Sequence, residues 1–368
     1  LLPRSQRLSR ASVLRSASPL LGARQLDGTG IRVGIWDGNV MQHPDFGNRV
    51  HQQEYEQQGN GSEQHGTHVA GSVLGSGLLN ERAYGMAPRA TAYTYNFGGS
   101  NGLSAQEEML EAKKKFGISL TQNSYGTPLT GQCQYYYRLN YRQNDFELDI
   151  LTNLQPSITH VFAAGNEQAF CSDITTERYG VPGYGTTTWR AKNVIYAGAV
   201  NTAGLITNFS SCGPQDDGRM FPTIMSKGEQ VLSTQPNASY APMKGTSMAC
   251  PIASGTLALI QQRYLQLHNN RPIRNDILKA LVINTADDAG RRGPDFQYGY
   301  GILNAENAID CLENGVIISD SLSLGDVKNF KLPIPKGDYT QAKVTLVWND
   351  LPLEKAVDTE TDFHIYRY

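Results

Sequence analysis

Short apolar segments recur along most of the chain, and many of them end in glycine, aspartate or asparagine. Those with the length and the β-branched or aromatic content of strands are Ile31–Trp36, Thr91–Phe97, Ile118–Gln122, Thr159–Ala164 and Asn193–Val200. Stretches that favour helices lie between most of them, at His65–Ser76, Ser104–Lys115, Phe146–Asn153 and, further on, Met248–Leu267. Strands that alternate with helices predict an α/β fold with a mostly parallel sheet covered on both faces.

The polar residues of greatest interest stand where these strands end. Asp37 follows the first predicted strand, Ser124–Gly126 follow the third, and Asn166 follows the fourth. In parallel sheets the carboxyl ends of the strands share one edge, and functional sites gather there. We therefore expect these residues to lie near one another.

The pattern of apolar and polar residues changes after Ala308. Short alternating segments replace the strand–helix pattern, at Val316–Ile318, Asn329–Leu332, Ala342–Trp348 and Phe363–Tyr366. They predict a small, truncated β-sandwich module over residues 316–368, after a main domain at 28–315. Residues 1–27 carry several arginines and no acid before Asp27. They are interpreted as an N-terminal arm or as the remnant of a cleaved pro-segment.

Composition excludes several classes of function. The chain has 368 residues and a formal net charge of −2, which gives no reason to expect a nucleic-acid partner. No apolar run reaches the roughly 18 residues of a membrane span. A chain of this length buries enough surface to fold without disulfides or a metal.

The first chemical motif is Gly245-Thr246-Ser247, which opens a long apolar helix. A serine at a helix N-terminus lies beside unpaired backbone N–H groups and the positive end of the helix dipole, which favour an oxyanion forming next to it. Taken alone, Ser247 is more often a plain helix cap.

A second motif, His65-Gly66-Thr67-His68, places two histidines three residues apart. A helical zinc protease would need the H-E-x-x-H spacing, so a metal site is disfavoured here. The third motif is Asp37 itself, an acid at the end of an apolar strand, which is costly to bury without a partner. The fourth is Gly165-Asn166, where a side-chain amide could donate to a developing oxyanion.

Together these four blocks resemble the signature segments of the subtilisin-like serine protease family (peptidase S8), in order and over residues 28–312. The resemblance implies a hydrolase with the subtilisin-like three-layer sandwich. In that reading Asp37 orients His65, His65 is the general base, Ser247 is the nucleophile, and Asn166 contributes to the oxyanion hole. The tail resembles the start of the β-sandwich that follows the catalytic domain in a bacterial subgroup.

By the same resemblance, Asn123, Ser124, Tyr125 and Gly126 line the substrate cleft, and Tyr125 has either a subsite role or a packing role. Protein or peptide substrates are implied, cleaved by a secreted or cell-envelope enzyme, with no cofactor needed for the chemistry. The family often holds structural calcium, for which Asp45 is the candidate ligand, although the loop 75–84 lacks a clear acidic pattern. The metal site thus stays unknown.

Five cysteines leave two interpretations open. They are either buried thiols or form one or two disulfides, with Cys133 pairing with Cys171 and Cys212 with Cys250. The function has an alternative as well, a catalytically silent, peptide-binding pseudoprotease on the same fold. Retention of all three triad residues favours the active enzyme.

Overall fold

A parallel sheet forms the centre of the molecule. The computed structural model describes residues 4–18, 24–55, 60–98, 102–126, 141–169, 180, 183–186, 189–215, 217–323, 325–332, 337 and 342–352. Within them, seven strands pair in the order β2-β3-β1-β4-β5-β6-β7, all parallel. They are β1 (Arg32–Asp37), β2 (Val50–Gln52), β3 (Thr91–Asn96), β4 (Leu120–Asn123), β5 (Thr159–Ala163), β6 (Ile195–Val200) and β7 (Ile224–Lys227). The α/β prediction is confirmed.

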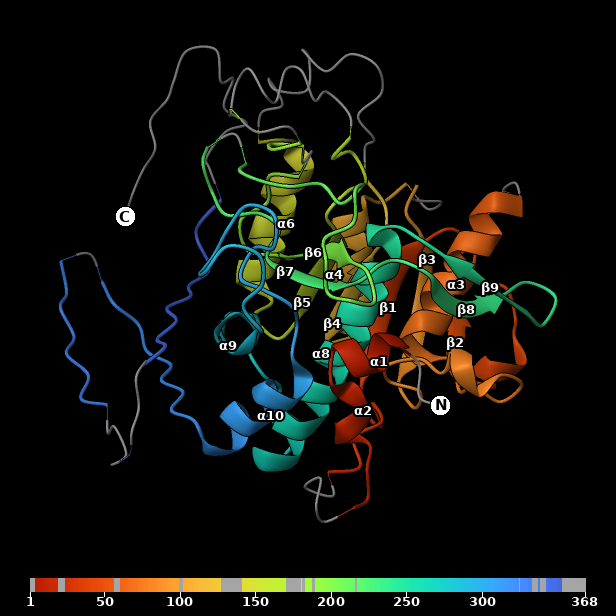
Figure 1. The fold of residues 1–368 in the computed structure, drawn as a ribbon, viewed down its shortest axis with the longest axis horizontal. Coiled ribbons are helices and arrows are strands. Elements are labelled where there is room, and N and C mark those ends of the chain that lie inside the picture. Colours follow the sequence, from red (N-terminus) through yellow and green to blue (C-terminus); the bar gives the residue numbers. More distant parts are fainter. Residues whose placement is uncertain are drawn as a thin grey trace.

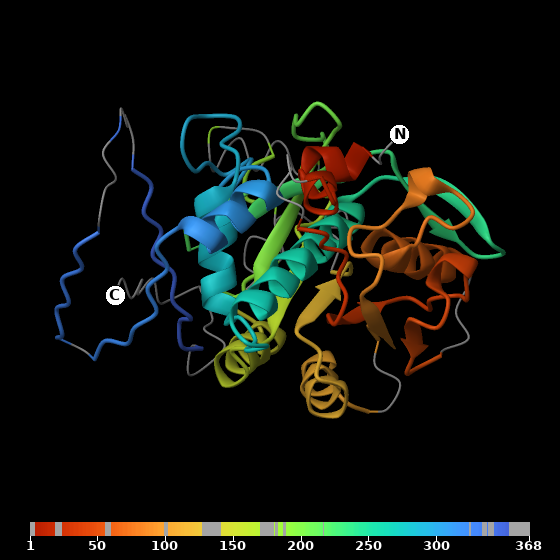
Figure 2. The ribbon, with the colours of Figure 1, turned by 90° about the horizontal axis from the view of Figure 1, so that it is seen from below.

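Helices cover both faces of this sheet (Figures 1 and 2). One face is covered by α3 (Asn60–Leu74) and α8 (Thr246–Leu267), and the other by α4 (Ala105–Phe116) and α6 (Gln143–Leu154). Two further helices follow, α9 (Asn275–Thr285) and α10 (Ala305–Asn314), and α10 packs on α8. A two-stranded antiparallel hairpin, β8 (Val231–Gln235) with β9 (Ser239–Met243), packs along α3.

The two faces of the sheet bury different kinds of side chain. Val33 and Ile35 of β1 belong to a largely aliphatic core under α3 and α8. Trp36 belongs to an aromatic core on the other face, with Phe162 and Tyr196. The division follows from the alternation of side chains along a strand, because each strand supplies both layers.

The position of β1 decides where the site lies. β1 lies between β3 and β4, so the chain leaves it first to one side and later to the other. Crevices at such a switch point, beyond the carboxyl ends of the strands, are the usual ligand sites of open α/β sheets. Asp37, Asn96 and Asn123 are the last residues of these three strands.

The N-terminal arm is packed on the main domain. It contains the short helices α1 (Arg4–Leu8) and α2 (Ala11–Leu14). Ala11 and Leu14 are fully buried, and Gln6 donates to the carbonyl oxygens of Tyr84 and Gly85 at 3.0 and 2.8 Å. Its origin as a pro-segment stays a prediction, as do the domain boundaries.

The C-terminal segment differs from expectation. The described residues between 316 and 352 form no strand, whereas strands were predicted at 316–318, 329–332 and 342–348. Residues 363–366 lie outside the described part. Val344, Leu346 and Trp348 are 75%, 80% and 58% exposed, so the predicted alternation is present without a sheet to bury it. A strand forms only where a neighbour satisfies its backbone groups.

Polar groups of this segment instead form hydrogen bonds with the main domain. Asn349 Nδ2 donates to Asn275 Oδ1 at 2.7 Å, and the backbone N–H of Asp350 donates to Asn193 Oδ1 at 2.8 Å. These bonds hold the extended segment beside α9 and the start of β6.

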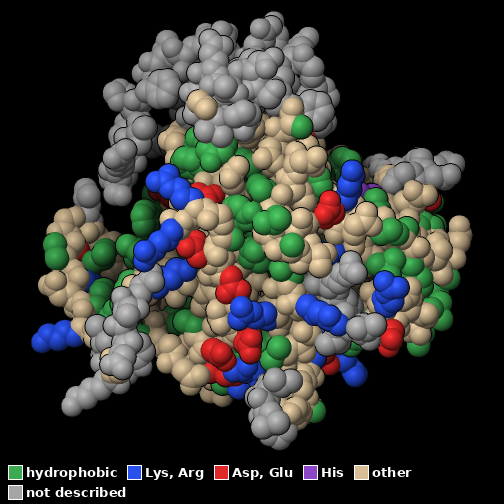
Figure 3. Space-filling view, in the orientation of Figure 1, with side chains coloured by type: hydrophobic (Ala, Val, Ile, Leu, Met, Phe, Trp, Pro, Cys, Tyr) green, Lys and Arg blue, Asp and Glu red, His purple; other side chains and the backbone are tan. Residues whose placement is uncertain are grey.

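The surface carries no concentrated charge on the face drawn in Figure 3, where Lys and Arg side chains are interspersed with Asp and Glu. None of the helices in the described residues combines the length and apolar character that a membrane span requires.

Candidate active site

Asp37 is the innermost charged group of the site. It ends β1 and is 2% exposed. Its Oδ1 accepts from the backbone N–H of Gly38 at 2.8 Å and lies 2.6 Å from His65 Nδ1. Because Oδ1 is an acceptor, Nδ1 carries the proton in this pair and Nε2 is left as the basic nitrogen.

His65 lies on α3, which comes unusually close to the chain after β1. A Cβ atom added at Gly66 would lie 2.3 Å from the carbonyl oxygen of Gly38, so only glycine allows this approach. The Asp37 carboxylate raises the pKa of His65, against an opposing effect of burial. A protonated imidazole at this position is therefore stabilised.

Ser247 is the second residue of α8. The preceding Gly245 has φ 146°, a conformation that side chains rarely adopt, and it turns the chain sharply into the helix. Ser247 Oγ donates to the carbonyl oxygen of Ser124 at 3.3 Å. No hydrogen bond joins Ser247 to His65 among the described residues, but both line one cleft of about 570 Å³ together with Asp37.

Asn166 faces the same cleft from the loop after β5. Its Oδ1 accepts from the backbone N–H and the hydroxyl of Thr246 at 2.8 and 3.1 Å. With the oxygen held in this way, the Nδ2 group remains as a donor in the cleft that Ser247 also lines. The backbone N–H groups at the start of α8 provide further donors.

The expected substrate strand is placed only in part as predicted. Ser124, Tyr125 and Gly126 line the cleft. Asn123 does not, because its side chain is fully buried and Nδ2 donates to Thr121 Oγ1 and to the Val161 carbonyl oxygen. The role of Asn123 in substrate binding stays a prediction, which its main chain and not its buried side chain would have to fulfil. Asn123 is the last residue of β4, and its side chain points toward Val161 of the neighbouring strand β5.

The cleft also has aromatic walls that the motifs did not reveal. Phe97 stacks on Tyr125 at 5.3 Å, and Trp189 packs edge-on against Tyr125 at 6.2 Å. Tyr125 thus has both a packing role and a place in the cleft. Phe97 could have been suspected, since it is the last residue of a predicted strand, whereas Trp189 lies in a long loop with no local signal.

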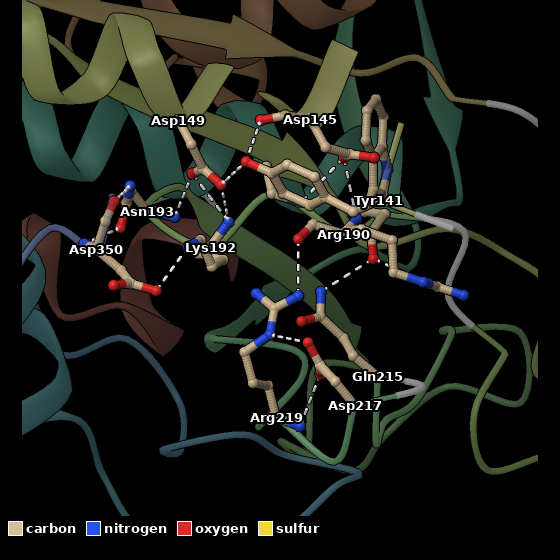
Figure 4. Close-up of polar contacts among 12 residues, drawn as sticks. Tyr141, Asp145, Asp149, Arg190, Lys192, Asn193, Gln215, Asp217, Arg219 and Asp350 are labelled. Atoms are coloured by element: carbon tan, nitrogen blue, oxygen red, sulfur yellow. Dashed lines mark hydrogen bonds and ion pairs between the residues drawn. The ribbon is translucent and has the colours of Figure 1, made fainter. Parts of the chain in front are cut away.

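A buried polar cluster holds the segment that carries Trp189 (Figure 4). Asp145 Oδ1 accepts from the backbone N–H groups of Arg190 and Ala191 at 3.1 and 2.9 Å. Asp149, one helical turn later on α6, accepts from those of Lys192 and Asn193. Each carboxylate is thereby satisfied by fixed backbone donors, which positions the segment against the sheet.

The predicted pairing of Cys212 with Cys250 is wrong, because both are free. Each thiol is buried in its own polar contact, Cys212 with the Ser210 carbonyl oxygen and Cys250 with that of Asn123. Burial raises their pKa to about 12 and about 11, so neither is a ready nucleophile. Cys133 and Cys171 lie outside the described residues.

The calcium expectation can be examined at Asp45. Its Oδ1 accepts from the Tyr240 hydroxyl at 2.9 Å, and its Oδ2 from the backbone N–H of Gly77 at 3.1 Å. Calcium needs 6–8 oxygen ligands, whereas hydrogen-bond donors surround this carboxylate. Among the described residues, no group of three or more His, Cys, Asp or Glu side chains is arranged so that it could hold a metal ion. Asp45 in this arrangement does not fit a calcium site.

His68, the second histidine of its motif, hydrogen-bonds to backbone carbonyl oxygens of the β8–β9 hairpin. Its Nε2 lies 2.9 Å from the carbonyl oxygen of Val231 and 3.2 Å from that of Ala241. Burial lowers its pKa to about 4, so it is neutral and ties α3 to the β8–β9 hairpin.

Comparison with known proteins gives consistent matches. The profile of the subtilase family (peptidase S8) matches residues 28–301. Subtilisin BL from Lederbergia lenta is 29% identical over 306 residues, which cover 80% of this chain and 97% of that protein. Serine protease AprX from Bacillus subtilis (strain 168) is 28% identical over 77% of this chain and 67% of its own length.

Solved structures share the fold. A mutant of the protease domain of PatA superposes with a TM-score of 0.58 at 22% identity, over 79% of this chain and 98% of that one. The prenylagaramide maturation protease PagA gives a TM-score of 0.57 at 21% identity, over 76% and 93% of the two chains.

Proposed function

This chain belongs to the subtilase family and is a subtilisin-like serine endopeptidase, a hydrolase, and on that premise we propose that Asp37, His65 and Ser247 form its catalytic triad. The observation that carries the proposal is the 2.6 Å contact between His65 Nδ1 and Asp37 Oδ1, in the same cleft as Ser247 and Asn166. The proposed substrates are proteins or peptides, and the chemistry needs no cofactor.

The first half of the reaction needs a rotation of the Ser247 hydroxyl. It turns from the Ser124 carbonyl oxygen toward His65 Nε2, which takes its proton as Oγ bonds to the scissile carbonyl carbon. Contacts of this kind are often long before substrate binds. The carbonyl oxygen becomes an oxyanion that accepts from Asn166 Nδ2 and the Ser247 backbone N–H.

The second half releases two products in turn. The C–N bond breaks, and the amine leaves with the proton that His65 held, so an ester of Ser247 remains. A water molecule then gives a proton to His65 and attacks the ester carbonyl. Ser247 Oγ leaves and recovers that proton, which frees the acid product and restores the enzyme. Asp37 stays ionised and stabilises the imidazolium throughout.

Extended peptides would bind alongside Ser124–Gly126, in the manner of strand addition at a sheet edge. Gly126 favours this, because its backbone is exposed and the Trp189 ring lies 3.4 Å from where a Cβ would be. Main-chain hydrogen bonds would supply affinity, and the aromatic walls would select side chains.

The test is covalent labelling of the folded protein with a serine-directed phosphonate. We expect one label, on Ser247, and loss of both labelling and peptide hydrolysis in Ser247→Ala. Ser254→Ala is the matched control, since Ser254 lies on the same helix but donates to the Cys250 carbonyl oxygen away from the cleft. A folded protein that neither labels nor cleaves would instead support the silent peptide-binding alternative.

We also propose a secreted or cell-envelope location and removal of a pro-segment, both of which rest on the similarity to subtilisins. For residues 316–368 we keep the proposal of a β-sandwich module. It is supported by the period-two exposure of Val344, Leu346 and Trp348, which suits one face of a strand. Fractionation of the expressing cells and N-terminal sequencing of the mature protein test location and processing.

A further inference from the structure

A buried asparagine, Asn96, is the register partner of the proposed catalytic aspartate, Asp37. Asp37 ends β1 and Asn96 ends β3, and the two residues are paired in register. Register partners in neighbouring parallel strands are about 4.8 Å apart and direct their side chains to the same face. The preceding pair shows this on the opposite face, where Trp36 and Tyr95 stack with ring centroids 4.6 Å apart.

The unpaired atoms of these two side chains are complementary. Asp37 is 2% and Asn96 1% exposed. In the part of the chain that the structure describes, Asp37 Oδ2 and Asn96 Nδ2 are both buried without a hydrogen-bond partner. One of these atoms can only accept and the other can only donate.

The orientation of the Asn96 amide is fixed by its other end. Asn96 Oδ1 accepts from the backbone N–H of Gly98 at 3.0 Å, which leaves Nδ2 as the free end. Asp37 Oδ1 is likewise occupied, by Gly38 and His65. A buried carboxylate oxygen and a buried amide N–H without partners both carry a desolvation cost, and one hydrogen bond between them removes both.

We propose that Asn96 is a positioning residue for the catalytic site, whose Nδ2 donates to Asp37 Oδ2 either after a small rotation of the two side chains or through one ordered water. Such a bond fixes the rotation of the carboxylate, so that Oδ1 stays aimed at His65 Nδ1. It also holds the ends of β1 and β3 in register at the cleft. This inference rests on the proposed triad.

The test compares Asn96→Leu and Asn96→Asp with Thr94→Val. Leucine has a similar size but no donor, and aspartate keeps the acceptor for Gly98 but has no amide. Thr94 is the matched control, because it lies two residues earlier on the same face, is 3% exposed, and has an Oγ1 without a partner among the described residues. Turnover is counted per active site by phosphonate titration, so that misfolded protein does not enter.

We expect kcat to fall about tenfold in Asn96→Leu, with KM within about twofold of the parent. Tenfold corresponds to about 1.4 kcal/mol, close to the lower end of the range for a hydrogen bond to a charged group. In Asn96→Asp the loss should grow as pH rises, because a protonated carboxyl still donates and an ionised one does not. The downfield NMR resonance of the His65 Nδ1 proton should move in both variants and stay in place in Thr94→Val.

Turnover within twofold of the parent at all pH values, with an unmoved Nδ1 resonance in both variants, would overturn the inference. Should Asn96→Leu fail to fold, Asn96→Asp and its pH dependence decide alone. If the parent protein does not label at Ser247, the triad itself fails. If it labels and the variants keep their turnover, only the role of Asn96 is lost.

Discussion

Replacing Gly66 by alanine tests how the close approach of α3 sets up the site. The new Cβ would lie 2.3 Å from the Gly38 carbonyl oxygen and 2.7 Å from that of Asn39, where contacts below 3.0 Å are essentially never observed. Both obstacles are backbone atoms, which no side-chain rotation can relieve. Either α3 or the chain after β1 must move.

The size of that movement follows from the geometry. Relieving the contact with Gly38 needs a shift of about 1 Å, and a misplacement of that size costs roughly 10²-fold in rate. The shift separates His65 on α3 from Asp37 at the end of β1, whose present contact is 2.6 Å. Stability should change much less, since alanine gains up to about 1 kcal/mol of helix propensity against roughly 1–3 kcal/mol of overpacking.

The assay is kcat/KM on a fluorogenic peptide, together with urea unfolding of the same preparation. We expect activity to fall about 100-fold while the free energy of unfolding falls by about 2 kcal/mol or less. Gly293→Ala is the control for destabilisation that leaves the site in place: its φ of 81° makes an alanine strained, but the added Cβ meets no atom within 4 Å. It should lower the free energy of unfolding and leave activity unchanged. A Gly66→Ala enzyme with activity within threefold of the parent would refute the link between this approach and catalysis.

Three further predictions concern pH, metal and stability. Activity should fall as pH drops, with a midpoint above 6.5, because the base must be neutral and Asp37 raises the pKa of His65. Excess chelator should leave the thermal unfolding temperature unchanged. Tyr240→Phe should lower the free energy of unfolding by about 2 kcal/mol, because it removes one hydrogen-bond donor from Asp45. Asp149→Ala should lower the free energy of unfolding, measured in urea, by about 3 kcal/mol or more, because it leaves several buried hydrogen-bond donors unpaired.

Each of these predictions has an outcome that contradicts it. A midpoint below 6.5 would mean that the Asp37 carboxylate does not govern His65. A lower unfolding temperature in the presence of chelator would show a structural cation. For Asp149 the control is Asp350→Ala, which removes a half-exposed partner of Lys192 and should cost less than about 1 kcal/mol.

The sequence predicted five of the seven strands of the sheet and the helices α3, α4, α6 and α8, because their signals are local, but it did not predict β2, β7, the β8–β9 hairpin, α9 or α10. Apolar runs of strand length separated by helical stretches predicted β1, β3, β4, β5 and β6 to within two residues at either end. A parallel sheet brings the carboxyl ends of its strands to one edge by necessity. That is why Asp37 and Asn166 could be expected near each other from the sequence alone.

Other features depended on neighbours that are distant in the chain. Asn123 belongs to a motif at a strand end, yet the register of β4 against β5 turned its amide toward Val161 and away from the cleft. The thiols of Cys212 and Cys250 found separate carbonyl partners. Their pairing was a question of distance between two folded segments, which spacing in the sequence does not measure.

The sequence by itself determined the alternation of strands and helices and which side chains are candidates for the chemistry, because both depend on local periodicity and residue type. Tertiary structure decided what surrounds those side chains. It placed Asn96 beside Asp37 through strand register and placed Trp189 at the cleft through the carboxylates of α6. Such contacts join residues far apart in the chain, and only the folded sheet fixes the distance between them.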